Sequence, residues 1–291
     1  MFLLILVFLL LVPITCKVTR RGIPPYRENS NVRYELIWAD EFNYLGSPDP
    51  EKWNYEEGFV RNKEPQWYQP ENVFVNGRHL VITARKENYS ERDNKQSSIG
   101  QTDNQAKPSY TSGSLTTAGK FDFQYGKVEI RAKLDVRGSS WPAFWLVGSY
   151  NLYHLEQRPF PALAEIDVME YYERHLYANL FWQGKREFNE SVKKYSIDQF
   201  PASVNWSQFH VWTLIRTPEK ILIIFDRAYL LNEIDIKGIK NYYLKNNPFH
   251  ENFYFILNLA LRKNRKKQIT HPTQEQDAKL EVDYIRVYRA L

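Results

Sequence analysis

Apolar and polar residues alternate with a period of two along much of the chain. The clearest example is the segment 126–134, in which Val128, Ile130 and Ala132 alternate with charged residues. Successive side chains of a β-strand point to opposite faces, so this segment predicts a strand with one buried face. Comparable short apolar runs predict further strands at residues 79–83, 110–116, 143–146, 166–171, 177–181, 211–216, 222–225, 253–261 and 280–288.

No segment of the sequence has the 3.6-residue periodicity of a convincing helix. Many short strands separated by turns predict an all-β fold, namely a two-sheet antiparallel β-sandwich. We expect longer loops at residues 86–108, 149–163 and 232–250. A sandwich of this kind has a curved inner face that can hold an extended, chain-like ligand.

The first twelve residues, MFLLILVFLLLV, form an apolar run that ends at Pro13. The run is shorter than the ~20 residues that a membrane-spanning helix needs, and it has the length of the hydrophobic region of a signal peptide. We therefore expect a signal peptide at residues 1–16, an extended lead-in at 17–32, one domain at 33–291, and a secreted protein that is free of the membrane after cleavage. The alternative is a signal anchor with Lys17, Arg20 and Arg21 on the cytosolic side.

The composition is that of a globular protein, with 43% hydrophobic and 25% charged residues, which excludes disorder, collagen and coiled coil. A net charge of +5 is small for 291 residues and does not indicate a nucleic-acid partner. The single cysteine excludes an intrachain disulfide. Three Asn-x-Ser sequons, at Asn88, Asn189 and Asn205, predict N-glycosylation and support secretion. We expect a monomer.

The candidate chemistry lies in residues 164–171, AEIDVMEY. Glu165 and Asp167 share one face of a strand, whereas Glu170 joins them only if a β-bulge absorbs one residue between Asp167 and Glu170. The two glutamates could then approach the ~5–5.5 Å separation of a retaining glycosidase. A solvated edge or a calcium site are the alternatives, but the apolar residues between the acids favour a buried strand and a bulge near Val168 and Met169.

Aromatic residues lie close to these acids in the sequence, at Trp141 and Trp145 in the run WPAFW and at Trp67 in the run QWY. Aromatic faces cover the C–H surfaces of sugar rings, while polar side chains hold their hydroxyls. Packing in the core is the alternative for each tryptophan. For Trp141 and Trp145 the shared strand face with a candidate acid favours a place in the cleft.

The run AEIDVMEYY resembles the bulged E-x-D-x-x-E signature of glycoside hydrolase family 16, in its laminarinase-like branch. Further blocks of that family follow in order at residues 34–42, 58–68, 111–134, 140–148, 255–261 and 282–288. The resemblance implies that residues 33–291 are a catalytic domain with a jelly-roll fold and a concave carbohydrate-binding cleft. It also implies an endo-acting hydrolase that cleaves a β-glucan, with β-1,3 linkages expected, with retention of configuration and without a catalytic cofactor.

The same resemblance assigns roles to individual residues. It implies that Glu165 is the nucleophile, Asp167 its helper and Glu170 the general acid/base. It places Trp141, Trp145 and Trp182 beside the sugar nearest the cleaved bond, and Asn62 and Trp67 deeper in the non-reducing half of the cleft. Some members hold a structural calcium on the convex side, for which Glu41 and Asp283 are the matching acids.

Two departures from the family pattern leave the substrate open. Phe181 stands where many laminarinase-like members have a histidine, and a basic run at residues 262–267 replaces a glycine-rich turn. The basic run is a solvated loop, or it attracts an acidic polysaccharide; nucleic-acid binding is a distant third explanation. The alternative functions are a non-catalytic β-glucan-recognition protein and a family enzyme for a galactan or a sulfated polysaccharide. Because all three acids are present, the enzyme is favoured.

Overall fold

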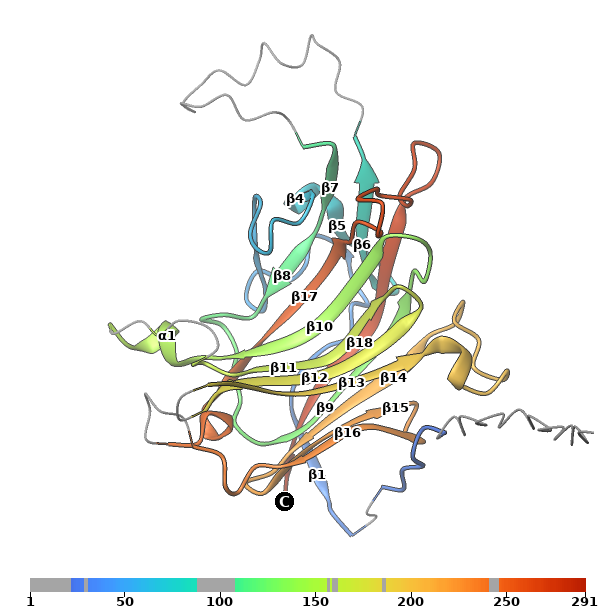
Figure 1. Cartoon of the computed structure of the whole chain (residues 1–291). Coiled ribbons are helices and arrows are strands. Elements are labelled where there is room, and N and C mark those ends of the chain that lie inside the picture. Colours follow the sequence, from blue (N-terminus) through green and yellow to red (C-terminus); the bar gives the residue numbers. More distant parts are fainter. Residues whose placement is uncertain are drawn as a thin grey trace, which may run out of the picture.

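The computed structural model describes residues 22–28, 31–87, 108–155, 158, 162–184, 187–240 and 246–291. Within these residues two β-sheets pack face to face (Figure 1). Strand pairing there is antiparallel throughout, except between the short strands β4 and β7. The predicted all-β, two-sheet sandwich is therefore confirmed.

The first sheet contains eleven of the described strands. Its order is β16 (Tyr229–Asp235), β15 (Lys220–Phe225), β14 (His210–Arg216), β9 (Gly126–Leu134), β18 (Ala278–Ala290), β6 (Leu80–Lys86), β5 (Val73–Asn76) and β2 (Leu45–Gly46), while β1 (Tyr34–Asp40) pairs with β18, β7 (Tyr110–Ser112) with β6, and β4 (Gln66–Tyr68) with β7.

The second sheet, called the cleft sheet below, contains the other seven described strands. Its order is β13 (Phe188–Ser196), β12 (His175–Gln183), β11 (Glu165–Tyr172), β10 (Ser140–Gly148), β17 (Phe253–Leu261), β8 (Ser114–Thr116) and β3 (Asn54–Tyr55).

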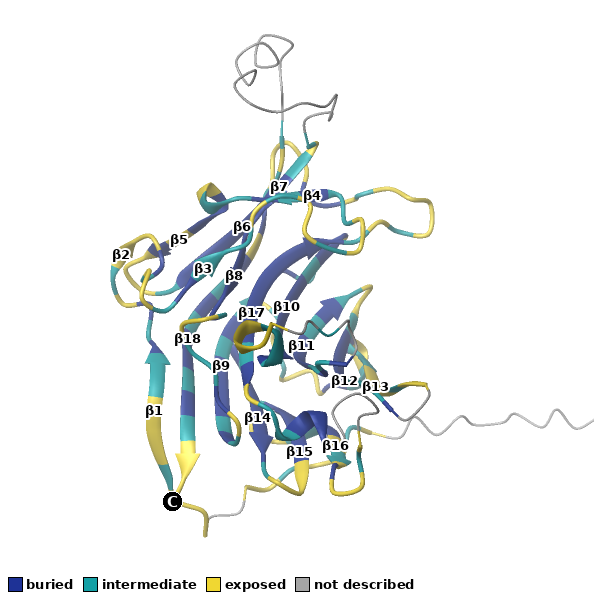
Figure 2. Ribbon diagram, turned by 90° about the vertical axis from the view of Figure 1, so that its left-hand side faces the viewer, coloured by how far each residue is buried: buried dark blue, intermediate teal, exposed yellow. Residues whose placement is uncertain are grey.

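The core lies between the two sheets and is built by the alternation seen in the sequence. In β9 the residues Val128, Ile130 and Ala132 are fully buried against the cleft sheet, which contributes Phe144 and Leu146 from β10. Figure 2 shows buried stretches in dark blue along strands of both sheets. The opposite face of the cleft sheet is thereby left free to carry a site.

Each strand range expected from the sequence contains a strand in the structure, and the structure differs from the prediction in several places. The expected strand at residues 110–116 is two strands, β7 and β8, separated by Gly113. The short strands β2 to β5 were not among those predicted. Strand β13, which is polar and largely exposed, and strand β16, which ends inside the expected loop at 232–250, were not predicted either. The expected loop at 149–163 contains one short helix, α1 (Tyr150–Tyr153).

The lead-in is extended where it is described. Tyr26 donates its N–H to the carbonyl of Ala228 at 2.8 Å, and Leu230 donates to the carbonyl of Pro24 at 2.9 Å, so this segment runs beside β16. Residues 1–21 lie outside the described residues, so the signal peptide stays a prediction. None of the helices in the described part of the chain is long and apolar enough to cross a membrane.

The three sequons differ in their surroundings. Asn205 is exposed in a turn, and Asn189 is half-buried in β13 opposite Trp182. Asn88 lies outside the described residues. N-glycosylation therefore stays a prediction at all three positions.

Candidate active site

Strand β11 contains the β-bulge that the sequence predicts. On β12, Asp167 pairs with Asn179 and Glu170 pairs with Tyr177, so two residues of β11 oppose a single residue between them. On β10, the register slips by one residue at Val168. Val168 and Met169 are both fully buried in the core between the sheets. The bulge thereby returns Glu170 to the cleft face.

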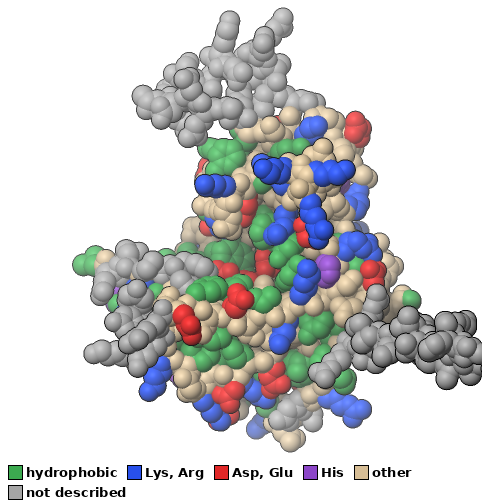
Figure 3. All heavy atoms as spheres, viewed as in Figure 1, with side chains coloured by type: hydrophobic (Ala, Val, Ile, Leu, Met, Phe, Trp, Pro, Cys, Tyr) green, Lys and Arg blue, Asp and Glu red, His purple; other side chains and the backbone are tan. Residues whose placement is uncertain are grey.

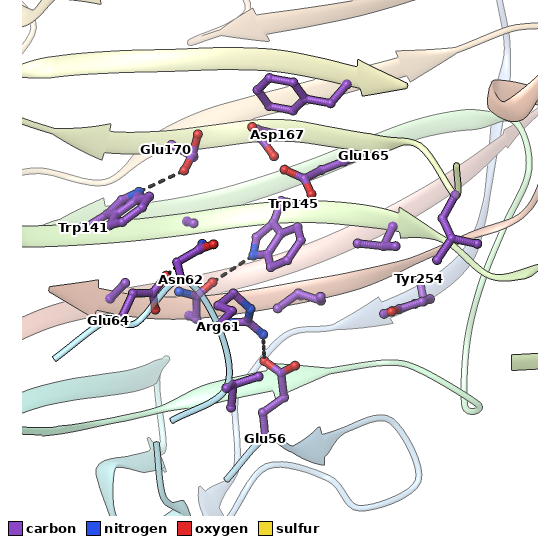
Figure 4. Close-up of a pocket in the computed structure, with 18 of the residues that line it drawn as sticks. Glu56, Arg61, Asn62, Glu64, Trp141, Trp145, Glu165, Asp167, Glu170 and Tyr254 are labelled. Atoms are coloured by element: carbon purple, nitrogen blue, oxygen red, sulfur yellow. Dashed lines mark hydrogen bonds and ion pairs between the residues drawn. The ribbon is translucent and has the colours of Figure 1, made fainter. Parts of the chain in front are cut away.

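A cleft of about 630 Å³ opens above the bulge, on the outer face of the cleft sheet. Glu165, Asp167 and Glu170 all line it, and Figure 4 shows the three carboxyl groups pointing into the same space. Figure 3 shows acidic side chains at the bottom of this hollow, with Lys and Arg side chains around its rim. The structure thus brings together the three acids that the sequence singles out.

Gly148 allows the chain that enters β11 to approach β10. A Cβ at this position would lie only 2.1 Å from the carbonyl oxygen of Leu163. The next residue, Ala164, has a positive φ of 58°, and its carbonyl accepts a hydrogen bond from the Gly148 N–H at 3.3 Å. This close contact sets the position of Glu165, the first residue of the strand.

Asn179 and Trp141 orient the acids. The side-chain N–H2 group of Asn179 donates to Oδ2 of Asp167 and to Oε2 of Glu170, both at 3.0 Å. The indole N–H of Trp141 donates to Oε1 of Glu170. Asp167 also hydrogen-bonds to Glu165 and to Glu170, so it lies between the two glutamates.

Burial raises the pKa of each of the three acids above its ordinary value. It raises the pKa of Glu165 to about 7, and it raises the pKa of Glu170 as well. The pKa of Asp167 lies well above its ordinary value, first because of burial and then because of the adjacent charges of Glu170 and Glu165. Like charges held this close cannot all ionise at neutral pH. The cluster therefore combines an ionised carboxylate with a protonated carboxyl.

Arg61 supplies the positive charge on the opposite wall of the cleft. Its guanidinium forms an ion pair with Glu56, which also accepts a hydrogen bond of 2.6 Å from the Ser114 hydroxyl. The guanidinium carbon lies 5.1 Å from the centre of the Trp145 ring. Arg61 also acts on Glu165, whose pKa its charge lowers.

A chain of hydrogen bonds holds Trp145 in place. Its indole N–H donates to Oδ1 of Asn258 at 2.8 Å, and the Asn258 amide donates to the Tyr68 hydroxyl at 3.0 Å. Tyr68 in turn donates to Glu64, which also accepts a hydrogen bond from Asn62 at 3.2 Å. The glutamate, the two asparagines and the tryptophan all line the cleft.

Several of these residues were not predicted from the sequence. Asn179 and Asn258 carried a usable signal, because each is a polar residue inside an otherwise apolar strand. Arg61 and Glu64 lie in the family block at residues 58–68, but nothing local indicated that they face the acids. Trp145, over which the Arg61 guanidinium lies, joins them only through the tertiary fold.

Three of the five predicted sugar-binding residues line the cleft, namely Trp141, Trp145 and Asn62. Trp182 is not among the residues that line the cleft. Trp182 packs against the core, with its ring 5.5 Å from that of Phe249, because its neighbour Phe181 takes the cleft face directly opposite Glu165. Trp67 lies outside the residues that line the cleft and packs edge-on against Phe59 at 5.3 Å.

The two acids expected to hold a structural calcium are engaged by arginines. Glu41 accepts two hydrogen bonds of 2.8 Å from Arg286, and Asp283 pairs with Arg131 at 2.5 Å. A calcium ion needs free carboxylate oxygens. The side chains present at these positions therefore do not fit a calcium site.

Comparisons with known proteins agree with this geometry. Residues 60–255 match the family model described as "Glycosyl hydrolases family 16". A β-glucanase of Rhodothermus marinus is 31% identical over 97% of this chain and 93% of its own length. A keratan-sulfate endo-1,4-β-galactosidase of Sphingobacterium multivorum is 29% identical over 88% of this chain and 55% of its own length.

Among solved structures, SCLam, a non-specific endo-β-1,3(4)-glucanase of family 16, superposes with a TM-score of 0.71 at 30% identity, covering 94% of this chain and 98% of its own. The match to the family model spans most of the chain and includes the bulged strand with its three acids. The chain therefore belongs to glycosyl hydrolase family 16.

Proposed function

We propose that this protein is a retaining endo-β-glucanase that cleaves β-1,3 linkages. The observation that carries the proposal is the bulge in β11, which places Glu165 and Glu170 on one face with Asp167 hydrogen-bonded between them. Retaining glycosidases use a pair of carboxyl groups that flank the glycosidic bond, an ionised one as nucleophile and a protonated one as general acid. The glucanases to which the chain is similar support a β-glucan as the substrate.

The reaction follows from the protonation of the acids. Protonated Glu170 donates its proton to the glycosidic oxygen as the bond breaks, and the Glu165 carboxylate attacks the anomeric carbon to form a glycosyl–enzyme ester. Glu170, now ionised, removes a proton from water, which hydrolyses the ester and regenerates Glu165. Asp167 hydrogen-bonds to Glu165 and so stabilises its charged form before attack.

The roles of the acids are tested by two variants. Glu165→Gln keeps the shape of the side chain but cannot attack, so we expect turnover on laminarin to fall by a factor of 10³ or more, on the order of the loss of a catalytic nucleophile. Glu170→Ala should regain activity on an aryl glycoside with an activated leaving group, because such a group departs without a proton. Loss of equal size on both substrates would contradict the role of Glu170.

Stereochemistry provides an independent measurement. NMR spectra recorded during the first minutes of laminarin hydrolysis should show the β-anomer of the new reducing end before mutarotation. The appearance of the α-anomer first would exclude the glycosyl–enzyme intermediate. A non-catalytic glucan-recognition protein would give neither product, although the presence of all three acids in a hydrogen-bonded cluster argues against it.

We further propose that the chain is a secreted, N-glycosylated monomer. The apolar run at residues 1–12 supports secretion, and the exposed sequon at Asn205 supports N-glycosylation. Expression in insect cells with and without inhibition of N-glycosylation tests it. Secreted protein that migrates faster after glycosidase treatment is expected, and protein retained in the membrane fraction would contradict it.

A further inference from the structure

The cleft sheet carries a group of aromatic and basic side chains beside Glu170, on the side away from Glu165. Directly opposite residues of paired strands share a face, so the register places them. Glu170 is opposite Tyr177 on β12, and Tyr177 is opposite Lys194 on β13. Tyr172 lies two residues beyond Glu170 and on the same face of the sheet.

These side chains form one continuous stack. The rings of Tyr172 and Tyr177 lie parallel, with centres 4.1 Å apart and 10° between their planes. The guanidinium carbon of Arg262 lies 4.2 Å from the Tyr172 ring and 5.4 Å from the Trp141 ring, while the Lys194 ammonium lies 5.4 Å from the Tyr177 ring. We call Arg262, Tyr172, Tyr177 and Lys194 the cation–tyrosine stack.

The stack presents charged N–H donors to a ligand. A guanidinium that lies over an aromatic ring keeps its N–H edges free, and these edges match the paired oxygens of a sulfate or carboxylate. The two rings hold Arg262 in place, so little side-chain freedom is lost when it binds an oxyanion. A neutral sugar that stacks on bare aromatic faces would find the Tyr172 ring occupied by Arg262 and Tyr177.

The charges around the stack favour an anion there and oppose one on the floor of the cleft. Within the described residues Arg262 forms an ion pair with Glu173 at 3.8 Å, and both side chains are more than 40% exposed, so this ion pair is weak. The charge of Arg262 also acts on Glu170, whose pKa it lowers. Lys263 and Arg265, which follow Arg262 in the chain, are exposed. The floor of the cleft instead holds several carboxyl groups, which repel an anionic group.

We propose that the cation–tyrosine stack binds an anionic substituent, a sulfate ester or a carboxylate, on the departing half of the substrate. The proposal rests on the proposed function, because Glu170 as the general acid identifies the side on which the leaving group lies. The substrate is accordingly a β-linked polysaccharide that carries oxyanion groups, with a charged sugar beyond the cleaved bond. The basic run of the sequence thereby acquires a role through its first residue.

Three polymers on one backbone test the proposal: laminarin, sulfated laminarin and carboxymethylated laminarin of equal degree of substitution. We expect the wild-type enzyme to cleave one of the anionic polymers with a higher kcat/KM than laminarin at low salt. The difference should shrink at physiological ionic strength, where screening shortens to ~8 Å. Preference for the sulfated or for the carboxymethylated polymer distinguishes the two oxyanions.

Arg262→Met is the decisive variant, and Arg265→Met is its matched control from the same basic run. Arg262→Met should lower the ratio of kcat/KM for the preferred anionic polymer over laminarin by about tenfold, the size of one lost charge-assisted hydrogen bond. Arg265→Met should leave that ratio within about twofold. Circular dichroism checks that both variants fold, as expected for partly exposed side chains.

Two outcomes would overturn the proposal. One is a wild-type enzyme that prefers neutral laminarin at low salt, and the other is an equal ratio in wild type and Arg262→Met. If none of the three polymers is cleaved, the proposed function fails instead. Calorimetric measurement of the binding of the same polymers to wild type and to Arg262→Met then tests separately whether the stack binds oxyanions. We expect tighter binding of an anionic polymer to wild type and loss of this difference in Arg262→Met.

Discussion

The indole Nε1 of Trp141 donates a hydrogen bond of 2.9 Å to Oε1 of Glu170. Burial raises the pKa of Glu170, and this hydrogen bond lowers it, because a donor stabilises the ionised carboxylate. A tryptophan that the sequence marks as a sugar-binding residue thus also adjusts the proposed acid. The two roles can be separated by removing the N–H group while keeping an aromatic ring.

Trp141→Phe should therefore raise the pKa of Glu170. The alkaline limb of the kcat/KM profile, where the general acid loses its proton, is expected to move to higher pH, accompanied by a lower maximum rate. Trp145→Phe is the control, because its indole donates to Asn258 and to none of the three acids. An alkaline limb that stays in place in Trp141→Phe, measured on laminarin between pH 4 and 10, would contradict the assignment.

The buried carboxyl cluster should make folding stability depend on pH. The pKa of Glu165 is about 7 in the folded protein and 4.5 in its ordinary state, so the folded state binds more protons between these values. Stability is then fully present below pH 4.5 and falls as the pH rises through 7. Glu165→Gln should remove this loss and be more stable than wild type at pH 8, by roughly 1–3 kcal/mol.

Urea unfolding at pH 4, 6 and 8 measures this difference. The two proteins should differ least at pH 4, where Glu165 is protonated in both the folded and the unfolded state. Glu71→Gln serves as the control for the loss of an exposed carboxyl group. A Glu165→Gln protein that is less stable than wild type at pH 8 would show that the buried carboxylate is stabilised by its surroundings.

Arg61 lowers the pKa of Glu165 from across the cleft. Arg61→Met keeps an unbranched, flexible side chain but removes the charge, so the pKa of Glu165 should rise. The acidic limb of kcat/KM, where the nucleophile becomes protonated, is expected to move to higher pH. Lys63→Met, on an exposed residue of the same loop, is the matched control. An unchanged acidic limb in Arg61→Met would exclude this electrostatic role.

Deletion of Val168 tests the bulge. The shortened strand would read Glu-Ile-Asp-Met-Glu, in which the three acids alternate regularly and still share one face. We expect a folded protein with measurable hydrolysis and a stability loss of about 1–3 kcal/mol from the repacked core. Val168→Ala removes core packing but keeps the bulge, so it separates the two effects. A deletion variant that folds but has no activity would mean that the bulge itself sets the geometry.

The strands and the bulge could be predicted because their signals are local. Alternation shows in β9, and the apolar residues between the acids of β11 require an irregularity if all three face the cleft. The face taken by Trp182 could not be predicted from the local pattern, since alternation fixes which residues share a face but not which of the two faces is the core. In the structure Phe181 takes the cleft face, opposite Glu165, so Trp182 takes the core face.

Long-range contacts explain the rest of what the sequence did not reveal. Asn258 is 113 residues from Trp145, with which it bonds, and 190 residues from Tyr68. The stack of Arg262 on Tyr172 likewise joins segments that are far apart in the chain. Such partners are chosen by the pairing of β17 with β10 and of β10 with β11, which no local pattern encodes.

Ala143 occupies the position between Trp141 and Trp145 on the face of β10 that lines the cleft, directly opposite Glu170 on β11. Its methyl side chain is small and stands between two large rings. Along the strand, each tryptophan is two residues from Ala143, which is ~6.6 Å. Because Ala143 is small, its side chain takes up little of the cleft beside the proposed acid. Any larger side chain there would fill the space between the rings and separate substrate from Glu170 without altering a single carboxyl group.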